Sequence, residues 1–386
     1  MESISVSAVI PAYNAELYIE KAIRSLLNQT IHIDEIIIVD DGSVDCTCEI
    51  VEEIQREQSK VFLYKQVNAG ASAARNKGIS KAKGNWILPL DADDECSEQL
   101  VENYIGKIQN GDYAAVYTNF VQINETSEVI SGIFSGYELR GNDGFCKMLI
   151  RNPIISPSGS MIKKTIYEEI NGFDINVKYV EDVDFWLRLL ANDFNIGHIE
   201  KPLISIRRHA TNTTASIEIT KAGEKILLDK YSISNIKEKI YKREYSIEDN
   251  HLDFANLLIR YEKWLEADEV LKANQVDKNN NRYISFLFIK SIVALHFKKL
   301  HLAKEYYFEI LESNRQHGAA MNNLAVLYSL ENQFSSAKEL LSKVLEININ
   351  YLDAHHNLMI LSKDFIEYEE LKFTWRELRP NLLHYQ

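Results

Sequence analysis

Short apolar segments alternate with amphipathic helical patterns along the first 120 residues of the chain. The segments are rich in β-branched and aromatic residues, which is typical of strands, and they lie at 6–10, 35–40, 61–64, 86–90 and 114–120. After the first two segments, residues 15–29 and 43–58 carry apolar side chains at helical spacing, with Ser43 as the expected N-cap of the second helix. This alternation predicts βαβ units and a mainly parallel sheet, so we expect an α/β domain over residues 1–215.

The fourth strand segment runs directly into acidic residues. Four carboxylates lie within positions 91–95, immediately after the apolar residues of 86–90. The first and second strand segments end in the turns PAYN (11–14) and DDGS (40–43). In open parallel sheets, ligands bind at the carboxyl ends of the strands. We therefore expect a ligand site at this edge of the sheet, with a solvated acidic loop as the alternative interpretation.

Three other kinds of partner are disfavoured. A dinucleotide site needs a G-x-G-x-x-G turn after the first strand, and this chain has PAYN there. An EF-hand loop beginning at Asp91 would need glycine at its sixth position, which is Cys96, and a helix before the loop. A nucleic acid is an unfavourable partner because the formal net charge is −13 and no long basic segment offsets it.

Cysteine spacing and hydropathy give an expectation of cellular location. The four cysteines (Cys46, Cys48, Cys96 and Cys146) lack the spacing of a zinc site, and reduced thiols in the cytosol are the simpler interpretation. The sequence has no charged-then-apolar leader and no apolar run of about 18 residues. We therefore expect a cytoplasmic protein with neither a signal peptide nor a membrane span.

Six motifs follow one another in order along about 200 residues. They are VIPAYNAELYIEKAIRSLLNQT (9–30), IIIVDDGSVDCT (36–47), NAGASAARNKGISKAKGNWILPLDADD (68–94), NGFD (171–174), EDVDFWLRL (181–189) and RRHATNTTAS (207–216). In this order they resemble the family-2 glycosyltransferases of GT-A fold. The resemblance implies transfer of a sugar from a nucleotide-sugar donor with the help of a divalent cation.

The resemblance also implies which residues hold the donor. In the family, the Pro-x-Tyr-Asn turn and the first acid of D-D-G-S embrace the nucleoside. The implied nucleotide-sugar-binding residues are Pro11, Ala12, Tyr13, Asn14, Asp40, Asp41, Asn68, Gly70, Arg75, Asp91 and Ala92. Structural roles stay open for three of them: a packed core aromatic for Tyr13, a helix N-terminal partner for Asp41 and a surface ion pair for Arg75.

The metal site is implied by the D-x-D part of the acidic cluster. Asp93 is the expected ligand of Mn²⁺ or Mg²⁺, because hard carboxylate oxygens suit these ions. Asp91 is expected to contact the ribose or to complete the metal shell through water. His209, in the R-x-H segment, is a further candidate ligand, with a structural histidine as the alternative. A cation on the diphosphate would stabilise the negative charge of the leaving group.

The segment at 181–190 has a helical pattern with carboxylates near its N-terminal end. Clustered carboxylates raise one another's pKa, which makes a better general base. By resemblance, Asp182 is the base, Glu181 holds or tunes it, and Trp186 and Arg188 border the acceptor. Acids that only stabilise the N-terminus of their own helix are the alternative.

The chain of 386 residues is long enough for a second domain, and its later part is repetitive. After a helical connector at 216–247, residues 248–386 resemble tetratricopeptide repeats, most clearly in NNLAVLYSLENQFSSAKELLSKVLEIN (322–348). Ala303 and Ala337 are 34 residues apart in this region. We expect about three helix pairs and a capping helix, stacked as a short solenoid, with Lys290 as a departure from the apolar pattern.

Three hypotheses of function follow. In the first, the chain is a metal-dependent, inverting glycosyltransferase, with a UDP-sugar favoured as donor, and its repeats recruit a protein or peptide acceptor. In the second, the same domain builds a surface or capsular polysaccharide, and the repeats serve assembly, for example into a homo-oligomer. In the third, the chain is a non-catalytic nucleotide-sugar-binding scaffold, which the intact acids at 91, 93 and 182 disfavour.

Overall fold

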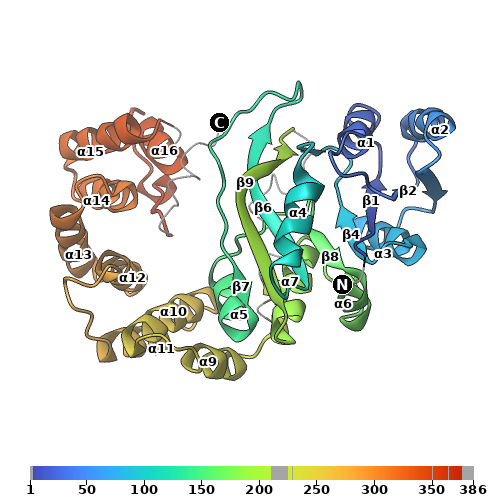
Figure 1. The fold of residues 1–386 in the computed structure, drawn as a ribbon. Helices are drawn as coiled ribbons and strands as arrows, with labels where there is room; N and C mark the ends of the chain where they lie inside the picture. The colour runs from blue at the N-terminus through green and yellow to red at the C-terminus, as the bar shows by residue number, and fades with distance from the viewer. Residues whose placement is uncertain (1–2, 210–224, 228, 350, 364, 376–386) are drawn as a thin grey trace. The chain divides into compact units, whose positions relative to one another are not determined.

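The computed structural model describes residues 3–209, 225–227, 229–349, 351–363 and 365–375. The chain divides into two compact units, Met1–Lys239 and Ile240–Gln386. The first unit contains a nine-stranded sheet with helices on its faces, and the described part of the second unit is helical (Figure 1). This confirms the expected fold class, an α/β domain followed by an all-helical region.

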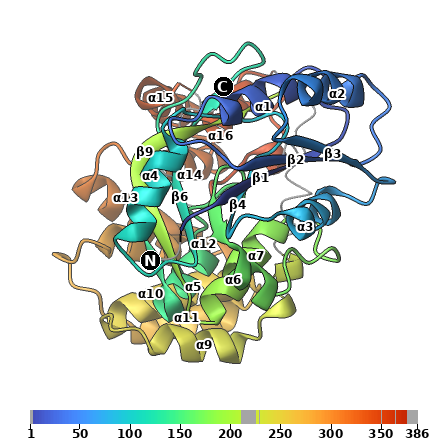
Figure 2. The same cartoon turned by 45° about the vertical axis from the view of Figure 1, so that its right-hand side comes forward.

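Four parallel strands form the first half of the sheet. They are β1 (Val6–Ala12), β2 (Glu35–Asp40), β3 (Val61–Lys65) and β4 (Trp86–Pro89), in the spatial order β3–β2–β1–β4. Helices α1 (Ile19–Leu27) and α2 (Thr47–Glu57) lie on one face, and α3 (Ala71–Lys81) lies on the other (Figure 2). Right-handed crossovers give this arrangement, because the strand order runs outward from β1 to β3 and then returns to β4.

The second half of the sheet is mixed. Its strands are β5 (Glu95–Cys96), β6 (Ala115–Ile123), β7 (Leu139–Arg140), β8 (Met161–Lys163) and β9 (Asn195–Arg207). β8 is antiparallel to both β4 and β6, and β9 is parallel to β6, so β9 runs in the direction of β1–β4. The carboxyl end of β9 therefore lies at the same edge of the sheet as those of the first four strands.

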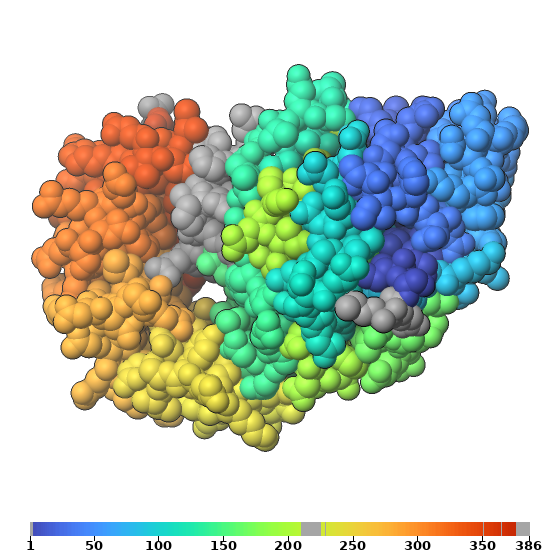
Figure 3. Space-filling model, viewed as in Figure 1, coloured from blue at the N-terminus to red at the C-terminus, as the bar shows by residue number. Residues whose placement is uncertain are grey.

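Four further helices of this unit lie between residues 100 and 191. They are α4 (Leu100–Gln109), α5 (Gly141–Ile150), α6 (Lys164–Glu169) and α7 (Glu181–Ala191). Helix α4 packs against β6 and β9 and forms the cyan surface in the middle of Figure 3. The apolar side of α7 is buried, which places its first turn at the margin of the core.

The start of α2 differs from the expected cap. The helix begins at Thr47, and Asp45 Oδ1 accepts a hydrogen bond from the Thr47 N–H at 3.1 Å. Ser43 lies before this turn, and its Oγ accepts a hydrogen bond from the Asn14 N–H at 2.9 Å. The prediction that Ser43 caps α2 is therefore wrong, and its hydroxyl instead joins the ends of β1 and β2.

In the described part of the helical unit, three successive helix pairs are followed by one more α-helix. They are α10 (Ile247–Arg260) with α11 (Trp264–Ala273), α12 (Tyr283–His296) with α13 (Leu300–Ser313), α14 (Gly318–Leu330) with α15 (Phe334–Ile347), and α16 (Leu352–Leu361). Alanines at the repeat positions, such as Ala303 and Ala337, are fully buried between helices. The assignment of these pairs to the tetratricopeptide repeats stays a prediction.

Along the chain, the boundary between the two units falls between Lys239 and Ile240. This point lies within helix α9 (Ile233–Tyr241) and within the predicted connector at 216–247. The predicted boundary at 215 lies outside the described residues, as does most of the RRHATNTTAS segment. In the described ranges, no helix has the length and hydropathy needed to cross a bilayer.

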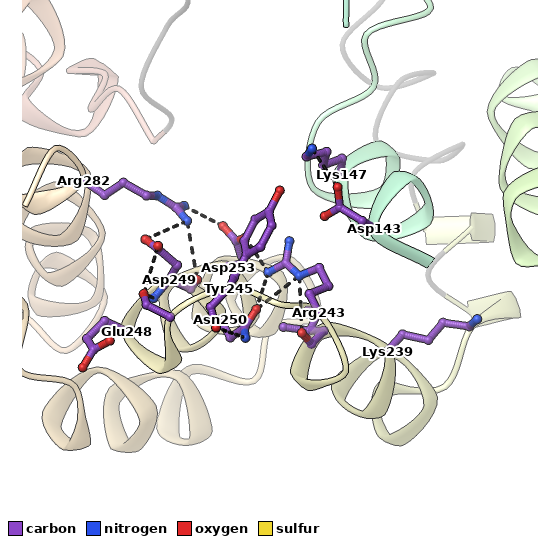
Figure 4. A network of polar contacts seen from close by, with 12 residues as sticks. Asp143, Lys147, Lys239, Arg243, Tyr245, Glu248, Asp249, Asn250, Asp253 and Arg282 are labelled. Atoms are coloured by element: carbon purple, nitrogen blue, oxygen red, sulfur yellow. Dashed lines mark hydrogen bonds and ion pairs between the residues drawn. The ribbon is translucent and has the colours of Figure 1, made fainter. Parts of the chain in front are cut away.

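Two features stabilise the helical unit with charged side chains. Asp253 accepts hydrogen bonds from Arg243 Nη2 at 2.7 Å and from Arg282 Nη2 at 2.5 Å, as Figure 4 shows. Such a buried group is stable only with its partners in place. The ammonium group of Lys290 lies over the rings of Phe286 and Tyr306, at 5.1 Å and 4.8 Å from their centroids. These cation–π contacts explain how Lys290 fits where an apolar residue was expected.

Candidate active site

The PAYN turn is hydrogen-bonded to the neighbouring DDGS loop. The side chains of Pro11 and Ala12 are buried at the end of β1, so only their main chain can contact a ligand. Asn14 adopts a positive φ of 48°, and its Oδ1 accepts a hydrogen bond from the Val44 N–H at 2.9 Å. Tyr13 is 53 % exposed at this edge of the sheet. It is therefore not a packed core aromatic, and its ring is available to a ligand.

The two acids of DDGS are buried and fix the surrounding loops. Asp40 accepts hydrogen bonds from the Gly42 and Ser43 N–H groups at 3.3 Å. Asp41 accepts from the N–H groups of Ala69 and Gly70, both at 2.8 Å. Gly70 is the N-cap of α3, so the Asp41 carboxylate lies at the N-terminus of α3, where the helix dipole favours it. Asp41 thus has the structural role that was left open for it, that of an acidic partner at a helix N-terminus, and the helix is α3.

Gly70 and Asn68 belong to the loop that Asp41 holds. Both are exposed, and Gly70 has a φ of +90°, a conformation that glycine adopts without strain. A Cβ added at Gly42 would lie 3.1 Å from the Asn68 main-chain nitrogen, so the DDGS loop and this loop approach closely. The structure thus brings the predicted donor residues of three segments to one edge of the sheet.

Arg75 joins the acidic cluster to the start of α7. Its Nη2 donates to Asp91 Oδ1 at 2.6 Å, and its Nη1 lies 3.5 Å from Glu181 Oε1. The Arg75 side chain is only 6 % exposed. The ion pair left open for this residue is therefore present but buried, and not on the surface. Contact of the guanidinium with a nucleotide stays a prediction. Arg75 ties together two predicted parts of the site that are 106 residues apart.

Asp93 and His209 lie in contact across the site. Asp93 Oδ2 and His209 Nε2 are 2.9 Å apart, and the His209 ring stacks on Tyr18 with 5.4 Å between centroids. Burial, followed by the nearby Asp91 charge, raises the pKa of Asp93. A positive charge at this point would relieve that repulsion. The structure therefore brings together the two side chains that were expected to bind the metal.

The other acids of the cluster hold the end of β9. Asp94 is buried, and its Oδ1 accepts a hydrogen bond from the Arg207 N–H at 2.9 Å. The fully buried Arg207 side chain donates to the Asp93 carbonyl at 2.8 Å and to the Glu95 carboxylate. Ala92 is buried between the two aspartates and can offer only main-chain groups. Asp94 and Glu95 thus have structural roles, which leaves Asp93 as the acid directed toward His209.

The donor set suits a hard divalent cation completed by a substrate. Across the residues the structure describes, no three His, Cys, Asp or Glu side chains form a metal site by themselves. Mg²⁺ is commonly held by one or two protein ligands together with substrate phosphates and water. Asp93 Oδ2 and His209 Nε2 lie 2.9 Å apart and offer one carboxylate oxygen and one imidazole nitrogen. By the chemistry of these donors, the pair would suit Mn²⁺ or Mg²⁺ when substrate and water supply the other ligands.

Asp182 is the carboxylate with the most perturbed environment on α7. It lies in the first turn of the helix, beside Glu181, and is half-buried. Burial, with the Glu181 charge as the next cause, raises the pKa of Asp182 to about 7. Arg75 acts in the opposite direction but does not cancel the effect. A carboxylate of this kind can accept a proton near neutral pH.

Residues 7–170 match the family model described as "Glycosyl transferase family 2". This part of the chain is a family-2 glycosyltransferase domain. A chondroitin synthase of Pasteurella multocida (strain Pm70) is 25 % identical over 390 residues, covering 93 % of this chain, which spans only 40 % of that protein. An uncharacterized glycosyltransferase of Haemophilus influenzae (strain ATCC 51907 / DSM 11121 / KW20 / Rd) is 27 % identical over 312 residues, covering 77 % of this chain and 91 % of that protein.

The crystal structure of S. aureus TarS 1-349 in complex with UDP-GlcNAc is similar in fold to this chain. It has a TM-score of 0.50 and 15 % sequence identity, and the match covers 89 % of this chain and 91 % of that one. At this level of identity the similarity concerns the fold alone. It is in keeping with the GT-A arrangement of the glycosyltransferase domain.

Of the two residues expected at the acceptor side, one is buried in the core of the glycosyltransferase domain. Trp186 is 0 % exposed and packs edge-on against Phe185, with 4.9 Å between ring centroids. Arg188 donates to Asp184 at 2.8 Å and to the Gly172 carbonyl at 2.6 Å. The prediction for Trp186 is corrected, because a fully buried ring cannot border an acceptor. The role of Arg188 at the acceptor side stays a prediction.

Sequence reasoning missed several residues that shape the site. Ser156 Oγ donates to Asp91 Oδ2 at 3.0 Å, and Ser158 Oγ accepts from the Asp91 N–H at 3.0 Å. These serines lie in an irregular loop that has neither helical nor strand periodicity, so no pattern identified them. Arg207 lies in the RRH segment, but only His209 was singled out there. The burial of Arg207 and its contacts with residues more than 110 positions away are visible only in the folded chain, so the sequence offered no signal for it.

Proposed function

We propose that the chain is a metal-dependent, inverting glycosyltransferase that moves a sugar from a UDP-sugar to a polypeptide. The observation that carries the proposal is the Arg75 bridge between Asp91 and Glu181. It links Asp91, two residues before Asp93, to Glu181, the neighbour of Asp182, and so supports a single site at the carboxyl edge of the sheet. Such a site has a place for a diphosphate and a proton acceptor for a hydroxyl group.

The donor is held by the loops at the ends of β1 and β2. The exposed Tyr13 ring offers a face to the base, and the loop of Asn68 and Gly70 allows close approach of main-chain groups. A UDP-sugar is proposed because TarS, which shares the fold, has been crystallised with UDP-GlcNAc. Asp93 and His209 would hold Mn²⁺ or Mg²⁺, and the bound ion would stabilise negative charge on the diphosphate as a Lewis acid.

The chemical step is a single displacement at the anomeric carbon of the sugar. The acceptor hydroxyl oxygen forms a bond to this carbon while the bond to the diphosphate oxygen breaks. The electron pair of the broken bond leaves with the nucleoside diphosphate, and the hydroxyl proton moves to the Asp182 carboxylate. One displacement inverts the configuration. The raised pKa of Asp182 supports its role, because a base with a pKa near the working pH is efficient.

A polypeptide is proposed as the acceptor because the helical unit has its own core and surface and can bind a partner independently. Polysaccharide synthesis is the second candidate. It is favoured by the alignment of the Pasteurella chondroitin synthase with 93 % of this chain. A cytoplasmic location is also part of the proposal, and it is in keeping with four cysteines that form no disulfide.

The test is a donor screen followed by a transfer assay. UDP-, GDP- and dTDP-sugars are incubated with the chain and Mn²⁺, and release of nucleoside diphosphate is measured with and without polypeptide or oligosaccharide acceptors. We expect a UDP-sugar to be turned over and Asp182→Asn to lose the transfer rate. Asp193→Asn, at an exposed position two residues after the end of α7, is the matched control. Binding of donor without any turnover would support the scaffold hypothesis instead.

A further inference from the structure

An extended segment of the chain lies against two helices of the helical unit. Leu371–Trp375 follows the short 3-10 helix η2 (Tyr368–Glu370) and runs beside α14 and α16, where it is drawn in red in Figure 1. The helices meet it with three asparagines, Asn322 and Asn323 on α14 and Asn357 on α16. All three asparagines are 0 % exposed. Fully buried amides need hydrogen-bond partners, and the segment supplies them.

Two of the asparagines bind the main chain of the segment at residues two apart. Asn357 Oδ1 accepts from the Lys372 N–H at 2.8 Å, and Asn357 Nδ2 donates to the Lys372 carbonyl at 2.9 Å. Asn323 binds Thr374 in the same way, at 2.6 Å and 2.8 Å. Asn322 connects them, donating to the Lys372 carbonyl at 3.1 Å and accepting from Asn357 at 3.0 Å. An extended strand presents equivalent groups every second residue, so this spacing fits any extended polypeptide.

One side chain of the segment is also recognised. The Thr374 hydroxyl donates to Asp353 Oδ2 at 2.7 Å and accepts from the Tyr351 hydroxyl at 3.0 Å and from Asn322 Nδ2 at 3.1 Å. The Lys372 side chain, by contrast, is exposed. The groove formed by these residues therefore selects a main chain, together with a hydroxyl-bearing side chain at the position of Thr374.

Packing accounts for part of this arrangement, because Leu371 is buried in the core of the helical unit and Phe373 packs against that core, but it does not account for the asparagines. Apolar side chains would close the end of a helix stack without the desolvation cost of three amides. A pair of amides that each match one N–H and one C=O has a use only when a main chain lies there. The asparagines are therefore explained by recognition of an extended chain, for which Leu371–Trp375 is the occupant in this structure.

We propose that Asn322, Asn323 and Asn357 form a binding groove for an extended polypeptide containing Ser or Thr, and that Leu371–Trp375 is a built-in competitor. The proposal deepens the proposed function, on which it rests for the identity of the incoming polypeptide as the acceptor. The competitor is joined to α16 by a short connection, so its effective concentration is on the order of millimolar. A polypeptide added in trans binds weakly until the competitor is released.

The experiment uses a fluorescent peptide with the sequence EYEELKFTWR, which copies residues 367–376. Its affinity is measured by fluorescence anisotropy on the full chain and on Thr374→Pro, without donor or metal. Proline removes the N–H and the hydroxyl of the competitor and leaves the groove unchanged. We expect Thr374→Pro to bind the peptide at least ~10-fold more tightly than the original chain, because an intramolecular competitor has been lost. Lys372→Ala, which removes only an exposed side chain, should behave as the original chain does.

Two further comparisons identify the groove as the site. A peptide N-methylated at the positions of Lys372 and Thr374 lacks the two N–H donors and should lose at least ~10-fold in affinity, as expected for buried amides left unpaired. Asn323→Leu, which has a similar volume, should have the same effect when combined with Thr374→Pro. Circular dichroism checks the folding of both variants. If Thr374→Pro fails to fold, the original chain can still be titrated with the methylated and the unmethylated peptide. A difference between their affinities then shows that the main chain of the peptide is bound.

Two outcomes would overturn the proposal of a peptide-binding groove. One is that folded Thr374→Pro and the original chain bind the peptide with equal affinity. The other is that the methylated and unmethylated peptides bind with equal affinity. Sugar transfer is not part of these measurements. Peptide binding that follows the expected pattern, with no polypeptide glycosylated in any donor assay, would uphold the groove and contradict only the proposed acceptor.

Discussion

At the scale of single residues, the site separates acids that hold the fold from acids that are available for chemistry. Asp41 and Asp94 each accept hydrogen bonds from main-chain N–H groups and anchor the ends of neighbouring elements. Asp93 is directed to His209, and Asp182 stands in a first helical turn with a raised pKa. This division of roles leads to two predictions.

The first prediction concerns the pH dependence of catalysis. Asp182 accepts a proton only when it is ionised, and its pKa is about 7, so kcat/KM should fall as the pH decreases below about 7. The slope should approach tenfold per pH unit, because one proton is involved. Asp182→Asn should remove this acid limb and lower the rate at least ~10²-fold, while donor affinity is kept. The measurement is kcat/KM from pH 5 to 9, with Asp193→Asn as control. A flat profile for the original chain would place the base elsewhere.

The second prediction concerns the metal. Asp93→Ala should abolish the Mn²⁺-dependent part of the affinity for a nucleoside diphosphate, because it removes one of two side chains that fit the cation. Asp112→Ala, which removes an exposed aspartate, should change nothing. Calorimetric titration of UDP with and without Mn²⁺ measures the difference. If metal-enhanced affinity persists in Asp93→Ala, the assignment of this residue fails.

Much of the site was predictable because its residues follow strands or begin a helix. The edge of the sheet, the Asp93–His209 pair and the exposure of Tyr13 are of this kind. The Arg75 bridge was not predictable, since its partners are far away in sequence and no local pattern relates them. Trp186 was misplaced for a geometric reason. Four residues of helix advance about 6 Å along the axis, which is enough to pass from the site at Asp182 into the core.

At the scale of elements, the close contact between α3 and the sheet is set by a small residue. A Cβ added at Gly78 would lie 2.4 Å from Val9 Cγ1 and 3.2 Å from Val39 Cγ2. These valines are buried on β1 and β2, so they have little room to move. The glycine therefore allows α3 to lie against the strands that carry the PAYN and DDGS loops.

The third prediction follows from this contact. Gly78→Ala should destabilise the chain by about 1–3 kcal/mol, because overpacking outweighs the gain in helix propensity. Gly106→Ala is the matched control: this glycine lies in α4, and an added Cβ would meet nothing within 4 Å. That substitution should stabilise the chain by about 0.5–1 kcal/mol. Urea denaturation of both variants gives the comparison, and a stabilising Gly78→Ala would show that α3 can shift.

The first two strands were predicted with nearly their observed bounds, whereas the shortest strands were not predicted. The strands expected at 6–10 and 35–40 are β1 and β2, because an uninterrupted apolar run identifies a strand buried on both faces. By contrast, β7 and β8 have two and three residues, too few to show any alternation. Their pairing depends on distant strands, and only the folded sheet defines it.

At the scale of the whole molecule, the chain contains two units with separate cores. The donor and base residues all lie in Met1–Lys239, and the groove that holds Leu371–Trp375 lies in Ile240–Gln386. The repeat pattern predicted the helix pairs, because each pair buries small residues at fixed spacing. It did not predict the groove, because the asparagines pair with a segment that has no period of its own.

The fourth prediction tests whether the first unit carries out sugar transfer and the helical unit binds the polypeptide acceptor. A chain ending near residue 245 should still hydrolyse the donor slowly and transfer to a small acceptor, because the site residues lie before that point. It should lose most of its kcat/KM on a polypeptide, since binding to the helical unit raises the local concentration of the acceptor. Paired measurements on both substrates give the ratio. Equal losses on small and large acceptors, with the shortened chain folded by circular dichroism, would mean that the helical unit only supports the fold.

The position of Trp375 gives this chain an intrinsic optical signal. Its indole is 51 % exposed and lies edge-on to the Phe373 ring, at 6.3 Å between centroids, directly beside the residues that occupy the groove. Release of the segment would carry this indole fully into water and shift its emission to longer wavelength. The other three tryptophans are Trp86 and Trp186, buried in the first unit, and Trp264 on α11, which stacks on the His296 ring at 4.0 Å between centroids. Their emission is the background that must be subtracted. Filling and emptying of the groove can thus be followed in real time on unlabelled protein, with Trp375→Phe as the blank.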